Sequence, residues 1–435
     1  MERYAMRELE KWKSNPDRKP LIIRGSRQVG KTWLMKEFAA RQYQHTAYIN
    51  FESSKPLRNL FAEDYDVQRI IAAVRIETGV PVEPGKTLII FDEIQEAEGA
   101  VTSLKYFHEN APHYHIISAG SLLGMATQRN VSFPVGMVEF LDLFPLNFEE
   151  FLRGLGHQSL ADLILSEEWD LIRNFRIKLI QHLRSYYYVG GMPEAVLTHG
   201  KKNDLREVRD VQKNILIAYE NDFSKHAPPE VAPRIRMLWN SIPAQLAKEN
   251  KKFIYNALKP GARSKDYEIA LSWLVDSGLV HQVFRVSKPG IPLKAYQDIS
   301  AFKLFITDAG LLCAMGDVDP RTLLEGNVIF GEFKGALTEQ YVLQQLKTIP
   351  GLPVYYWSAE RSTSEIDFLI QHNGRVIPVE VKAEENLKAK SLKVYSQKFS
   401  PATAIRTSMS DFRRGEWMIN LPLYAIGKIT DMIDD

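Results

Sequence analysis

Short, largely apolar runs alternate with amphipathic segments along the first third of the chain. Amphipathic stretches at residues 6–12 and 33–41 flank an apolar run at residues 20–23. Further apolar runs lie at residues 47–51, 88–91 and 115–118. Strands that alternate with helices in this way form a parallel sheet with helices on both faces. The pattern predicts an α/β domain over residues 1–155.

The rest of the chain changes character at two points. Helical periodicity continues from Phe151 to about Ser224, broken by turn-like residues at 190–193, and Pro228-Pro229 then marks a boundary. From about Ile329 a helix and several short strands return. The pattern predicts a helical connector over 156–228 and a second α/β region at the C-terminal end.

Composition and charge limit the class of protein. The 435 residues are 45% hydrophobic and 25% charged, as in ordinary globular proteins of two to four domains. The formal net charge is only +2, but residues 1–150 carry −2 and residues 233–295 carry +7. A single cysteine, Cys313, in an apolar context predicts a buried thiol and a reducing, cytoplasmic location, and no apolar run is long enough to cross a membrane.

A glycine-rich loop lies between the first apolar run and the following helix and matches G-x-x-x-x-G-K-[ST]. It consists of Gly25, Ser26, Arg27, Gln28, Val29, Gly30, Lys31 and Thr32. Such a loop turns its backbone N–H groups and the helix N-terminus toward phosphates. We expect Lys31 to contact the β/γ-phosphates and Thr32 to bind Mg²⁺. The motif therefore predicts ATP and Mg²⁺ as ligands.

The apolar run at residues 88–91 ends in two carboxylates, Asp92 and Glu93. Alone, this pair would indicate a solvated acidic turn. Beside a phosphate-binding loop, it predicts that Asp92 holds Mg²⁺ through water and that Glu93 orients or polarises the attacking water. The cation that faces the developing charge is unassigned, with Arg24, Arg27 and Arg129 as candidates.

Four motifs together resemble those of a known group. They are RQVGKT at 27–32, FDE at 91–93, PLNFEEFL at 145–152 and GGMPEA at 190–195. In combination they resemble the prokaryotic AAA-type P-loop ATPases that carry a C-terminal domain of unknown function. The resemblance covers essentially the whole chain. It implies an ATP-binding N-terminal domain, a winged-helix middle and a nuclease-like end, and it leaves oligomer formation open.

The resemblance also implies one further site residue and one departure. In such ATPases a polar residue at the end of the third strand contacts the γ-phosphate or the water, and Ser118 is the candidate, with Ser121 behind it. A plain turn serine is the alternative. Similar proteins often place Arg or Lys where this chain has Met137, which puts efficient hydrolysis in question.

The basic segment has the order helix, helix, hairpin, which is typical of a winged helix. The helices are expected at residues 234–248 and 264–278, and the hairpin begins with a strand at 279–286 and a turn at 287–290. The polar face of the second helix would meet the DNA major groove, and Lys288 would meet phosphate. The residues of that polar face are Arg263, Ser264, Lys265, Glu268 and Ser272. The alternative is a winged helix that serves as a scaffold or docks a protein.

Four charged residues near the C-terminus have a spacing that suggests a common site. A strand expected over 364–370 starts at an acidic pair that includes Asp367. Glu380 and Lys382 share one face of the next strand, over 376–382, because they are two residues apart. Glu339 lies on a helix upstream of both strands.

This spacing resembles that of the PD-(D/E)XK nucleases. The resemblance implies that Asp367 and Glu380 bind Mg²⁺, that Glu339 extends the metal site and that Lys382, supported by Gln397, positions the attacking water. The alternatives are a hairpin with salt-bridged charges and a nuclease fold that binds without cutting.

We therefore expect a multidomain α/β protein with an AAA-type P-loop ATPase domain (1–155), a helical connector (156–228), a winged helix (229–300) and a restriction-endonuclease-like domain (301–435). The expected function is ATP binding and hydrolysis coupled to binding or metal-dependent cleavage of nucleic acid, with DNA favoured. The alternative is a nucleotide-switched protein-interaction regulator with an inactive nuclease-like domain.

Overall fold

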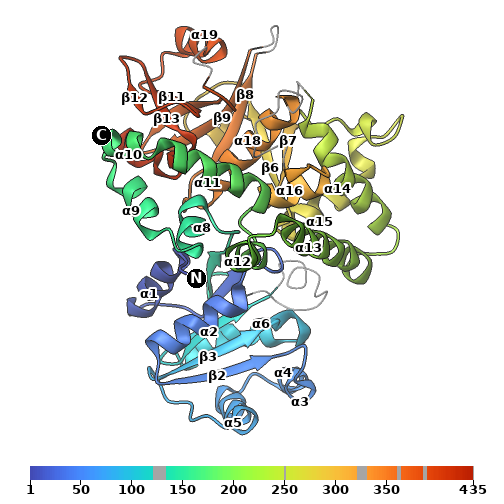
Figure 1. Cartoon of the computed structure of the whole chain (residues 1–435). Coiled ribbons are helices and arrows are strands. Elements are labelled where there is room, and N and C mark those ends of the chain that lie inside the picture. The colour runs from blue at the N-terminus through green and yellow to red at the C-terminus, as the bar shows by residue number, and fades with distance from the viewer. Residues whose placement is uncertain (121–133, 249–250, 321–330, 360–363, 386–388, 435) are drawn as a thin grey trace. The chain divides into compact units, whose positions relative to one another are not determined.

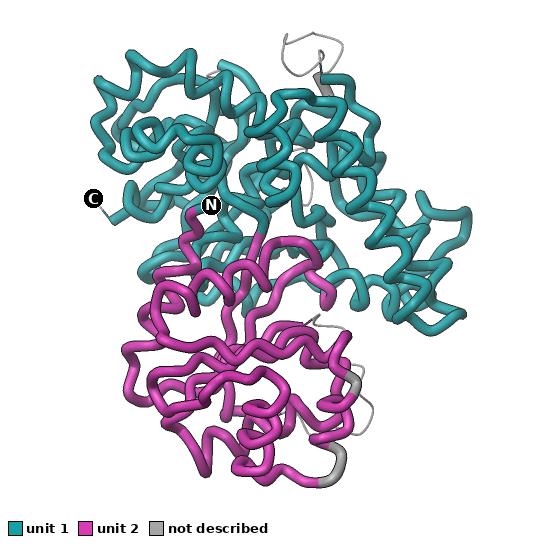
Figure 2. The backbone as a smooth tube through the Cα atoms, turned by 60° about the horizontal axis from the view of Figure 1, so that its bottom comes forward, with its two compact units in different colours: residues 1, 145–275, 279–435 teal, residues 2–144, 276–278 magenta. Residues whose placement is uncertain are grey.

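The structure is a computed structural model that describes residues 1–120, 134–248, 251–320, 331–359, 364–385 and 389–434. The chain forms two compact units (Figure 2). One contains residues 2–144 and 276–278, and the other contains residue 1 with residues 145–275 and 279–435. The first is called the N-terminal unit below and the second the C-terminal unit.

The N-terminal unit is built on a parallel sheet of five strands in the order β2-β3-β4-β1-β5 (Figure 1). The strands are β1 (Leu21–Arg24), β2 (His45–Asn50), β3 (Thr87–Asp92), β4 (His115–Ala119) and β5 (Glu139–Asp142). Because β4 lies between β1 and β3, the strand that leads into the glycine-rich loop and the strand that ends in Asp92 are separated by one strand. Their carboxyl ends lie at the same edge of the sheet, which is where parallel α/β sheets bind ligands.

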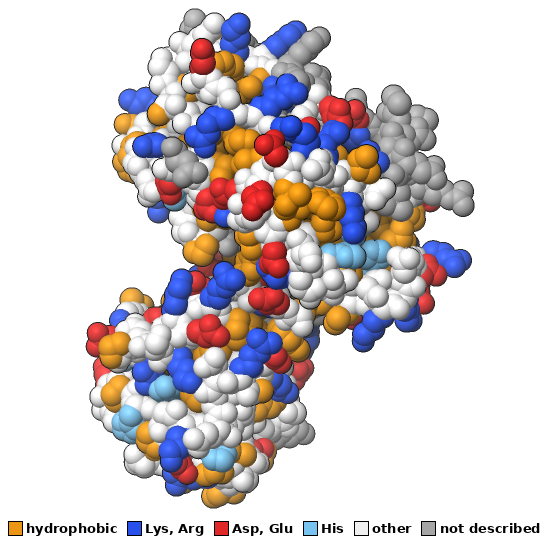
Figure 3. Space-filling model, turned by 60° about the vertical axis from the view of Figure 1, so that its left-hand side comes forward, with side chains coloured by type: hydrophobic (Ala, Val, Ile, Leu, Met, Phe, Trp, Pro, Cys, Tyr) orange, Lys and Arg blue, Asp and Glu red, His pale blue; other side chains and the backbone are white. Residues whose placement is uncertain are grey.

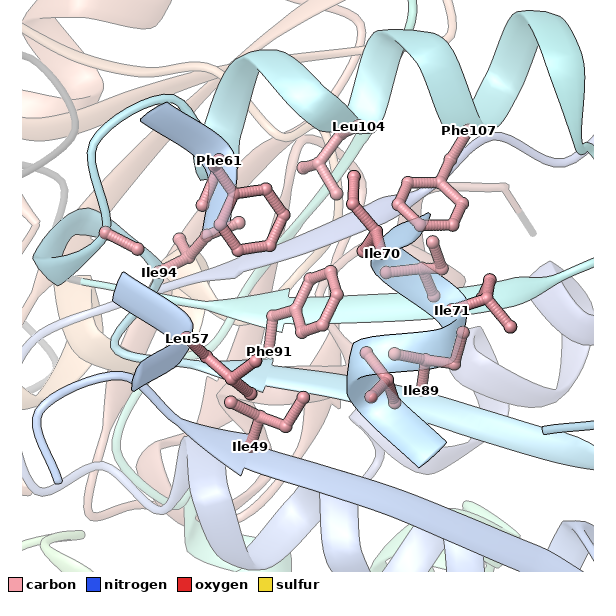
Figure 4. Packing of buried hydrophobic residues seen from close by; sticks show 14 of the residues in the cluster. Ile49, Leu57, Phe61, Ile70, Ile71, Ile89, Phe91, Ile94, Leu104 and Phe107 are labelled. Atoms are coloured by element: carbon pink, nitrogen blue, oxygen red, sulfur yellow. The ribbon is translucent and has the colours of Figure 1, made fainter. Parts of the chain in front are cut away.

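Helices cover this sheet on both faces. They are α1 (Ala5–Ser14), α2 (Lys31–Gln42), α3 (Lys55–Arg58), α4 (Leu60–Glu63), α5 (Val67–Thr78) and α6 (Ala100–Asn110), with the 3₁₀ turn η1 (Ile94–Glu96). On one face, Ile89 and Phe91 of β3 pack against α5 and α6 (Figure 4). Leu88 and Ile90 point to the other face, where α2 contacts the sheet. β3 is buried throughout, as its unbroken apolar run predicted.

The C-terminal unit begins with helices and continues with a mixed array of helices and strands. The helices are α8 (Phe148–Gly154), α9 (Gln158–Ser166), α10 (Trp169–Asn174), α11 (Arg176–Val189), α12 (Pro193–Lys202), α13 (Leu205–His226), α14 (Ala232–Leu246), α15 (Glu268–Asp276), α16 (Ala309–Met315), α18 (Gly331–Lys347), α19 (Lys390–Phe399) and α20 (Asp431–Asp434). Short 3₁₀ turns are η2 (Tyr255–Ala257), η3 (Ser264–Asp266), η4 (Leu293–Tyr296) and η6 (Leu423–Lys428).

The strands of this unit form one sheet of eight in the order β12-β13-β11-β10-β9-β8-β6-β7. They are β6 (Val280–Val286), β7 (Gln297–Ile306), β8 (Val354–Ser358), β9 (Glu365–His372), β10 (Arg375–Val381), β11 (Ala404–Ser408), β12 (Arg413–Arg414) and β13 (Met418–Pro422). The expected hairpin of β9 and β10 is present, with antiparallel pairing across the turn at Gly374. α19 contacts β9, β10 and β11, and α18 contacts β7 and β10.

The turn at residues 190–193 has a structural explanation. Gly190 ends α11 with φ of +73°, and a Cβ there would lie 2.1 Å from Oδ1 of Asp308. The N–H of Gly191 donates to Oδ2 of Asp308 at 2.6 Å, and Nε2 of Gln344 donates to the same oxygen at 2.9 Å. Asp308 also caps α16 by accepting from the N–H of Leu311. The buried carboxylate thus ties α11, α16 and α18 together.

Several predictions from the sequence can be compared directly with the structure. The α/β class and the parallel sheet with helices are confirmed. Cys313 is buried, as expected. β6 and β7 form the expected antiparallel hairpin. Because β6 also pairs with β8, this hairpin belongs to the same sheet as β9 and β10. The division into four domains, including a winged helix at 229–300, stays a prediction. Within the described residues, no helix has both the length and the apolar character that crossing a membrane requires.

Candidate nucleotide site and C-terminal carboxylate cluster

The glycine-rich loop follows β1 and leads into α2, as its motif predicts. Gly30 precedes α2 in the left-handed region with φ of +96°, and Gln28 has φ of +68°. Gly25 has φ of +150°, and a Cβ there would lie 2.2 Å from the carbonyl oxygen of Leu143. Only glycine fits this position, because both the backbone angle and the neighbouring carbonyl exclude a side chain.

The side chain of Lys31 folds back onto the start of the glycine-rich loop. Its Nζ donates to the carbonyl oxygens of Gly25 at 2.8 Å and Ser26 at 2.9 Å. Burial lowers the pKa of Lys31 to about 8, although the carboxylates of Glu93 and Asp92 oppose the shift. The ammonium group therefore lies where the negative charge of a bound phosphate would compensate for its loss of solvation.

The end of β3 brings Asp92 to the start of α2. Oγ1 of Thr32 donates to Oδ2 of Asp92 at 2.7 Å, and the hydroxyl of Tyr48 donates to the same oxygen at 3.0 Å. Burial, followed by the charge of Asp92, raises the pKa of Tyr48 to about 12, so the phenol stays a donor. Hydroxyl and carboxylate oxygens are the protein ligands that Mg²⁺ prefers. Thr32 and Asp92 together therefore fit a magnesium ion.

Glu93 is held in an unusual backbone conformation. Its φ is +51°, which a residue with a side chain rarely adopts, and its N–H donates to Oδ1 of Asp92 at 3.1 Å. Nε2 of Gln95 donates to Oε2 of Glu93 at 2.6 Å. Gln95 in turn lies against Gly120, where an added Cβ would be 2.4 Å from Oε1 of Gln95. The Glu93 carboxylate is thus oriented by Gln95 of η1, which itself packs against Gly120 at the end of β4.

Ser118 lies on β4, the strand between β1, which leads into the glycine-rich loop, and β3, which ends in Asp92. It is buried in β4 and is aligned with Ile22 of β1 on one side and Phe91 of β3 on the other. Its hydroxyl has no hydrogen-bond partner among the described residues. A buried hydroxyl without a partner costs free energy, so the position is one where a ligand or water could satisfy it. Ser121 lies outside the described residues.

The candidate arginines differ in availability. Arg24 forms two hydrogen bonds to Asp142 of β5, at 2.7 and 2.8 Å, and its guanidinium lies over the ring of Phe140. Arg27 is exposed in the glycine-rich loop, and Arg129 lies outside the described residues. Met137 ends a turn by donating its N–H to Pro134 at 3.1 Å. Arg24 is therefore engaged in holding β5 against β1.

Three residues that support the nucleotide site did not emerge from the sequence. Tyr48 and Gln95 contact Asp92 and Glu93, as described above, and Nη1 of Arg3 donates to the carbonyl oxygen of Val29 at 3.0 Å. Arg3 is buried, with Nη2 donating to Phe144 at 2.6 Å. The position of Tyr48 on a strand beside β3 was the only available signal, since parallel strands end at one edge of a sheet.

The C-terminal unit brings the predicted carboxylates together with additional cations. Lys382 directly follows β10, and its Nζ lies 2.7 Å from Oε1 of Glu380, so the two side chains lie on the same side of the strand end. Oδ2 of Asp367 accepts from the N–H of Val381 at 2.7 Å. Glu339 extends from α18 and is almost fully buried. Loss of solvation, reinforced by the charge of Glu339, raises the pKa of Asp367 to about 7.

Two lysines that the sequence did not single out enter this cluster. Lys303 of β7 is completely buried, with Nζ 2.5 Å from Oε1 of Glu365 and 3.6 Å from Oε2 of Glu339. Lys251 forms a hydrogen-bonded ion pair with Oε1 of Glu339. Burial opposes ionisation of Glu339, but the ammonium groups of Lys251 and Lys303 outweigh it, and the pKa of Glu339 falls below its usual value.

In the described part of the chain, no three Asp, Glu, His or Cys side chains are placed together as metal ligands would be. Gln397 is exposed on α19. Metal binding by Asp367 and Glu380, and support of Lys382 by Gln397, therefore stay predictions.

The basic segment exposes much of its charge. The proposed DNA-facing residues are exposed, whereas Tyr267, Leu271 and Leu274 are buried. The helix expected at 264–278 is shorter than predicted, because η3 comes first and α15 begins at Glu268, so three of the exposed residues precede α15. The exposed ones are Arg263, Ser264, Lys265, Glu268 and Ser272. Lys288 is exposed between β6 and β7 and lies over the ring of Tyr296. Part of the charge is neutralised, because Lys251 pairs with Glu339 and Arg285 with Asp298.

Solved structures resemble this chain only distantly. The Walker-type ATPase PABY2304 of Pyrococcus abyssi is 14% identical, with a TM-score of 0.43 over 72% of this chain and 94% of that one. The RuvB Holliday junction branch migration motor of Thermotoga maritima is 15% identical, with a TM-score of 0.30 over 65% and 89%. The ORC1 protein of Aeropyrum pernix in complex with DNA is 12% identical, with a TM-score of 0.25 over 72% and 91%. No curated protein sequence matches the chain.

Three family models match successive parts of the sequence. Residues 180–322 match a domain of unknown function, DUF8612, and residues 334–425 match another, DUF4143. Residues 17–152 match the AAA domain, and they contain the glycine-rich loop, Asp92 and all five strands of the parallel sheet. The N-terminal part of this protein is therefore an AAA-type P-loop ATPase domain.

Proposed function

We propose that the protein is an ATPase that couples its nucleotide state to nucleic-acid binding, with DNA as the favoured partner. Lys31 contacts the β/γ-phosphates, and Thr32 and Asp92 hold Mg²⁺. Glu93 orients the attacking water and polarises it by accepting its proton, and Ser118 contacts the γ-phosphate or that water. Magnesium, when bound with the nucleotide, neutralises charge on the phosphates. The remaining loop residues, from Gly25 to Gly30, supply backbone N–H groups to the phosphates.

One observation carries the assignment of the nucleotide site. The hydroxyl of Thr32 and the carboxylate of Asp92 are 60 residues apart in sequence and 2.7 Å apart in space. Asp92 stands at the end of a buried strand, and Thr32 in the first turn of the helix that follows the loop. A chance glycine turn would not bring the two magnesium ligand types together, so the contact supports a complete nucleotide site.

The nucleotide site can be tested with three variants of the full-length protein. Lys31→Ala should lose ATP affinity, because the cation that meets the phosphates is gone. Glu93→Gln should bind ATP normally but hydrolyse it on the order of 100-fold more slowly, since an amide orients water but cannot accept its proton. Glu98→Gln, which changes an exposed carboxylate nearby, should match the wild type. Unchanged nucleotide affinity in Lys31→Ala would show that the loop assignment is wrong.

The basic segment supports the nucleic-acid part of the proposal. Arg263 and Lys265 are exposed beside the polar side of α15, and neutralising phosphates with such side chains supplies most non-specific affinity. Binding should therefore weaken as salt rises. Arg263→Gln/Lys265→Gln should lower the slope of log affinity against log salt by about 1 to 2.

A matched control lies on another helix. Lys201 and Lys202 are exposed at the end of α12, and Lys201→Gln/Lys202→Gln removes the same charge from a different surface. This control should bind DNA like the wild type. Equal losses in the two double variants would contradict a specific role for the α15 surface. Fluorescence anisotropy with a labelled duplex, measured from low to moderate salt, gives both affinity and slope.

The alternative function is a nucleotide-switched protein-interaction regulator with an inert nuclease-like end. The ion pair of Lys251 with Glu339 favours this reading, because it engages one of the carboxylates expected to serve a metal. Absence of DNA and RNA binding at low salt, together with normal ATP hydrolysis, would support the regulator and overturn the nucleic-acid proposal. Metal-dependent cleavage is a further step that the sequence predicts.

A further inference from the structure

The C-terminal unit contains a carboxylate cluster that already has cations. We define the cluster as Glu339 of α18, Glu365 and Asp367 of β9, and Glu380 of β10. Its carboxylates come from the β9–β10 hairpin and from α18, which precedes it, and the ammonium of Lys303 lies within ion-pair distance of two of them, Glu365 and Glu339. A third carboxylate, that of Asp367, lies near enough to raise the pKa of Lys303 as well.

We propose that the ammonium group of Lys303 is the resident cation of this cluster and takes the place of a divalent metal ion. The carboxylates therefore hold β7, β9 and α18 together rather than a catalytic metal. It follows that the C-terminal unit does not cleave phosphodiester bonds with a metal ion bound at these carboxylates. This inference is independent of the nucleotide site and of nucleic-acid binding by the basic segment.

The balance of charge supports this assignment. The four carboxylates of the cluster are matched by four cationic side chains. These are Lys251 on Glu339, Lys303 between Glu339 and Glu365, Lys382 on Glu380, and Arg406, whose charge acts on Glu380. A metal site needs an excess of negative charge to repay the dehydration of the ion. Adding a divalent ion to this balanced set would leave it strongly positive.

Burial makes Lys303 a permanent member of the cluster. Its side chain is 0% exposed and is anchored on the central part of β7, whose last six residues are all buried. A buried ammonium must keep its partners, because an unpaired charge in the protein interior is strongly unfavourable. Lys382, by contrast, is 30% exposed and could turn to solvent. A divalent ion would therefore have to compete with a cation that cannot leave.

Asp367 and Glu380 are the two carboxylates that Lys303 does not pair with, and each of them also has an oxygen engaged within the protein. Asp367 uses one lone pair of Oδ2 to accept the N–H of Val381, which leaves its other oxygen with no hydrogen bond among the described residues. Oε1 of Glu380 is occupied by Lys382, while Oε2 is buried and has no hydrogen-bond partner among the described residues. An ion bound to Oδ1 of Asp367 and Oε2 of Glu380 would therefore have to take most of its ligands from water.

The experiment measures binding of Mn²⁺ alone to nucleotide-free, full-length protein by electron paramagnetic resonance, in which only free Mn²⁺ gives the sharp signal. The proteins are the wild type, Asp367→Asn, Lys303→Met, Lys303→Met/Asp367→Asn and, as a variant that keeps the charge, Lys303→Arg. The wild type and Asp367→Asn should bind Mn²⁺ equally, because the cluster of the wild type holds none. Lys303→Met should gain one ion with an affinity about tenfold or more above the wild type, since one buried positive charge is removed. Adding Asp367→Asn should abolish the gain.

Three outcomes overturn the proposal. One is a Mn²⁺ ion in the wild type that Asp367→Asn removes, since the metal and Lys303 would then coexist. Another is a folded Lys303→Met variant that gains no ion. The third is a Lys303→Arg variant that gains an ion, although it keeps the charge. If Lys303→Met does not fold, the comparison of the wild type with Asp367→Asn still decides, because it requires no change at Lys303.

Discussion

At the residue scale, Lys31 makes nucleotide binding sensitive to pH. Its pKa is about 8 in the nucleotide-free protein because it is buried, and phosphate charges would raise it again on binding. ATP affinity should therefore be fully present below pH 8 and should fall by up to about tenfold per pH unit above it. Calorimetry at pH 8.5 in two buffers of different ionisation enthalpy should show uptake of most of one proton. Lys36→Gln, on the same helix, should retain this uptake, and its absence in the wild type would contradict the assignment.

Gly25 gives a second prediction for single residues. Gly25→Ala would place a methyl group 2.2 Å from the carbonyl oxygen of Leu143 at φ of +150°, so the loop or the following backbone must move. We expect loss of ATP binding and a fall in unfolding free energy of about 2–3 kcal/mol. Gly85→Ala is the matched control, because Gly85 has φ of +71° but nothing within 4 Å of the added Cβ. It should cost only about 1 kcal/mol and leave ATP binding intact. Chemical denaturation and nucleotide titration measure both effects.

The site residues that the sequence predicts belong to local motifs, whereas the ones that it misses depend on contacts made only in the folded chain. Lys31, Thr32 and Asp92 follow from a local motif and a strand end, and the structure places Thr32 and Asp92 in contact. Gln95 and Lys303 could not be found this way. Their roles depend on which side chains the folded chain brings opposite them, and a lone glutamine or lysine carries no such signal in sequence. The cluster around Lys303 shows the consequence, since its cation comes from a strand that the sequence motif does not include.

At the element scale, Asp308 connects three helices through one buried carboxylate. Asp308→Ala would leave the N–H groups of Gly191 and Leu311 and the amide of Gln344 without their acceptor. Each unsatisfied buried donor costs about 1–3 kcal/mol, so we expect a loss of at least about 3 kcal/mol in unfolding free energy. Asp308→Asn keeps one acceptor oxygen and should lose roughly half as much. Equal stability of the wild type and Asp308→Ala in urea titrations would refute this role.

Most helices and strands were predictable because their apolar periodicity is local. The expected helix at 33–41 and strand at 88–91 correspond to α2 and β3, which extend only one or two residues further at most ends. β5 was missed because it has four residues and a half-buried pattern. The pairing of β6 with β8 was also beyond reach, since it joins segments about 70 residues apart and no local pattern encodes a long-range partner.

At the scale of the whole molecule, the near-zero net charge conceals an uneven distribution. The face drawn in Figure 3 mixes Lys and Arg with Asp and Glu side chains, in keeping with the total of +2. The segment 233–295 nevertheless carries +7, and folding neutralises part of it through Lys251 and Arg285. The charge available to phosphate is therefore smaller than the sequence suggests, which argues for salt-sensitive, moderate affinity rather than tight coating of nucleic acid.

Coupling between nucleotide and nucleic acid has a thermodynamic signature that the whole chain must show. If ATP changes the affinity for DNA by some factor, DNA must change the affinity for ATP by the same factor, which for coupled sites is typically about 5- to 150-fold. We expect equal factors of at least about fivefold from anisotropy titrations with and without ATP, and from ATP titrations with and without DNA. Glu93→Gln prevents turnover during the measurement, and Lys31→Ala should lose the effect of ATP while retaining DNA binding. A factor of one in both directions would mean that the two ligands bind independently, and that the ATPase domain serves a partner other than nucleic acid.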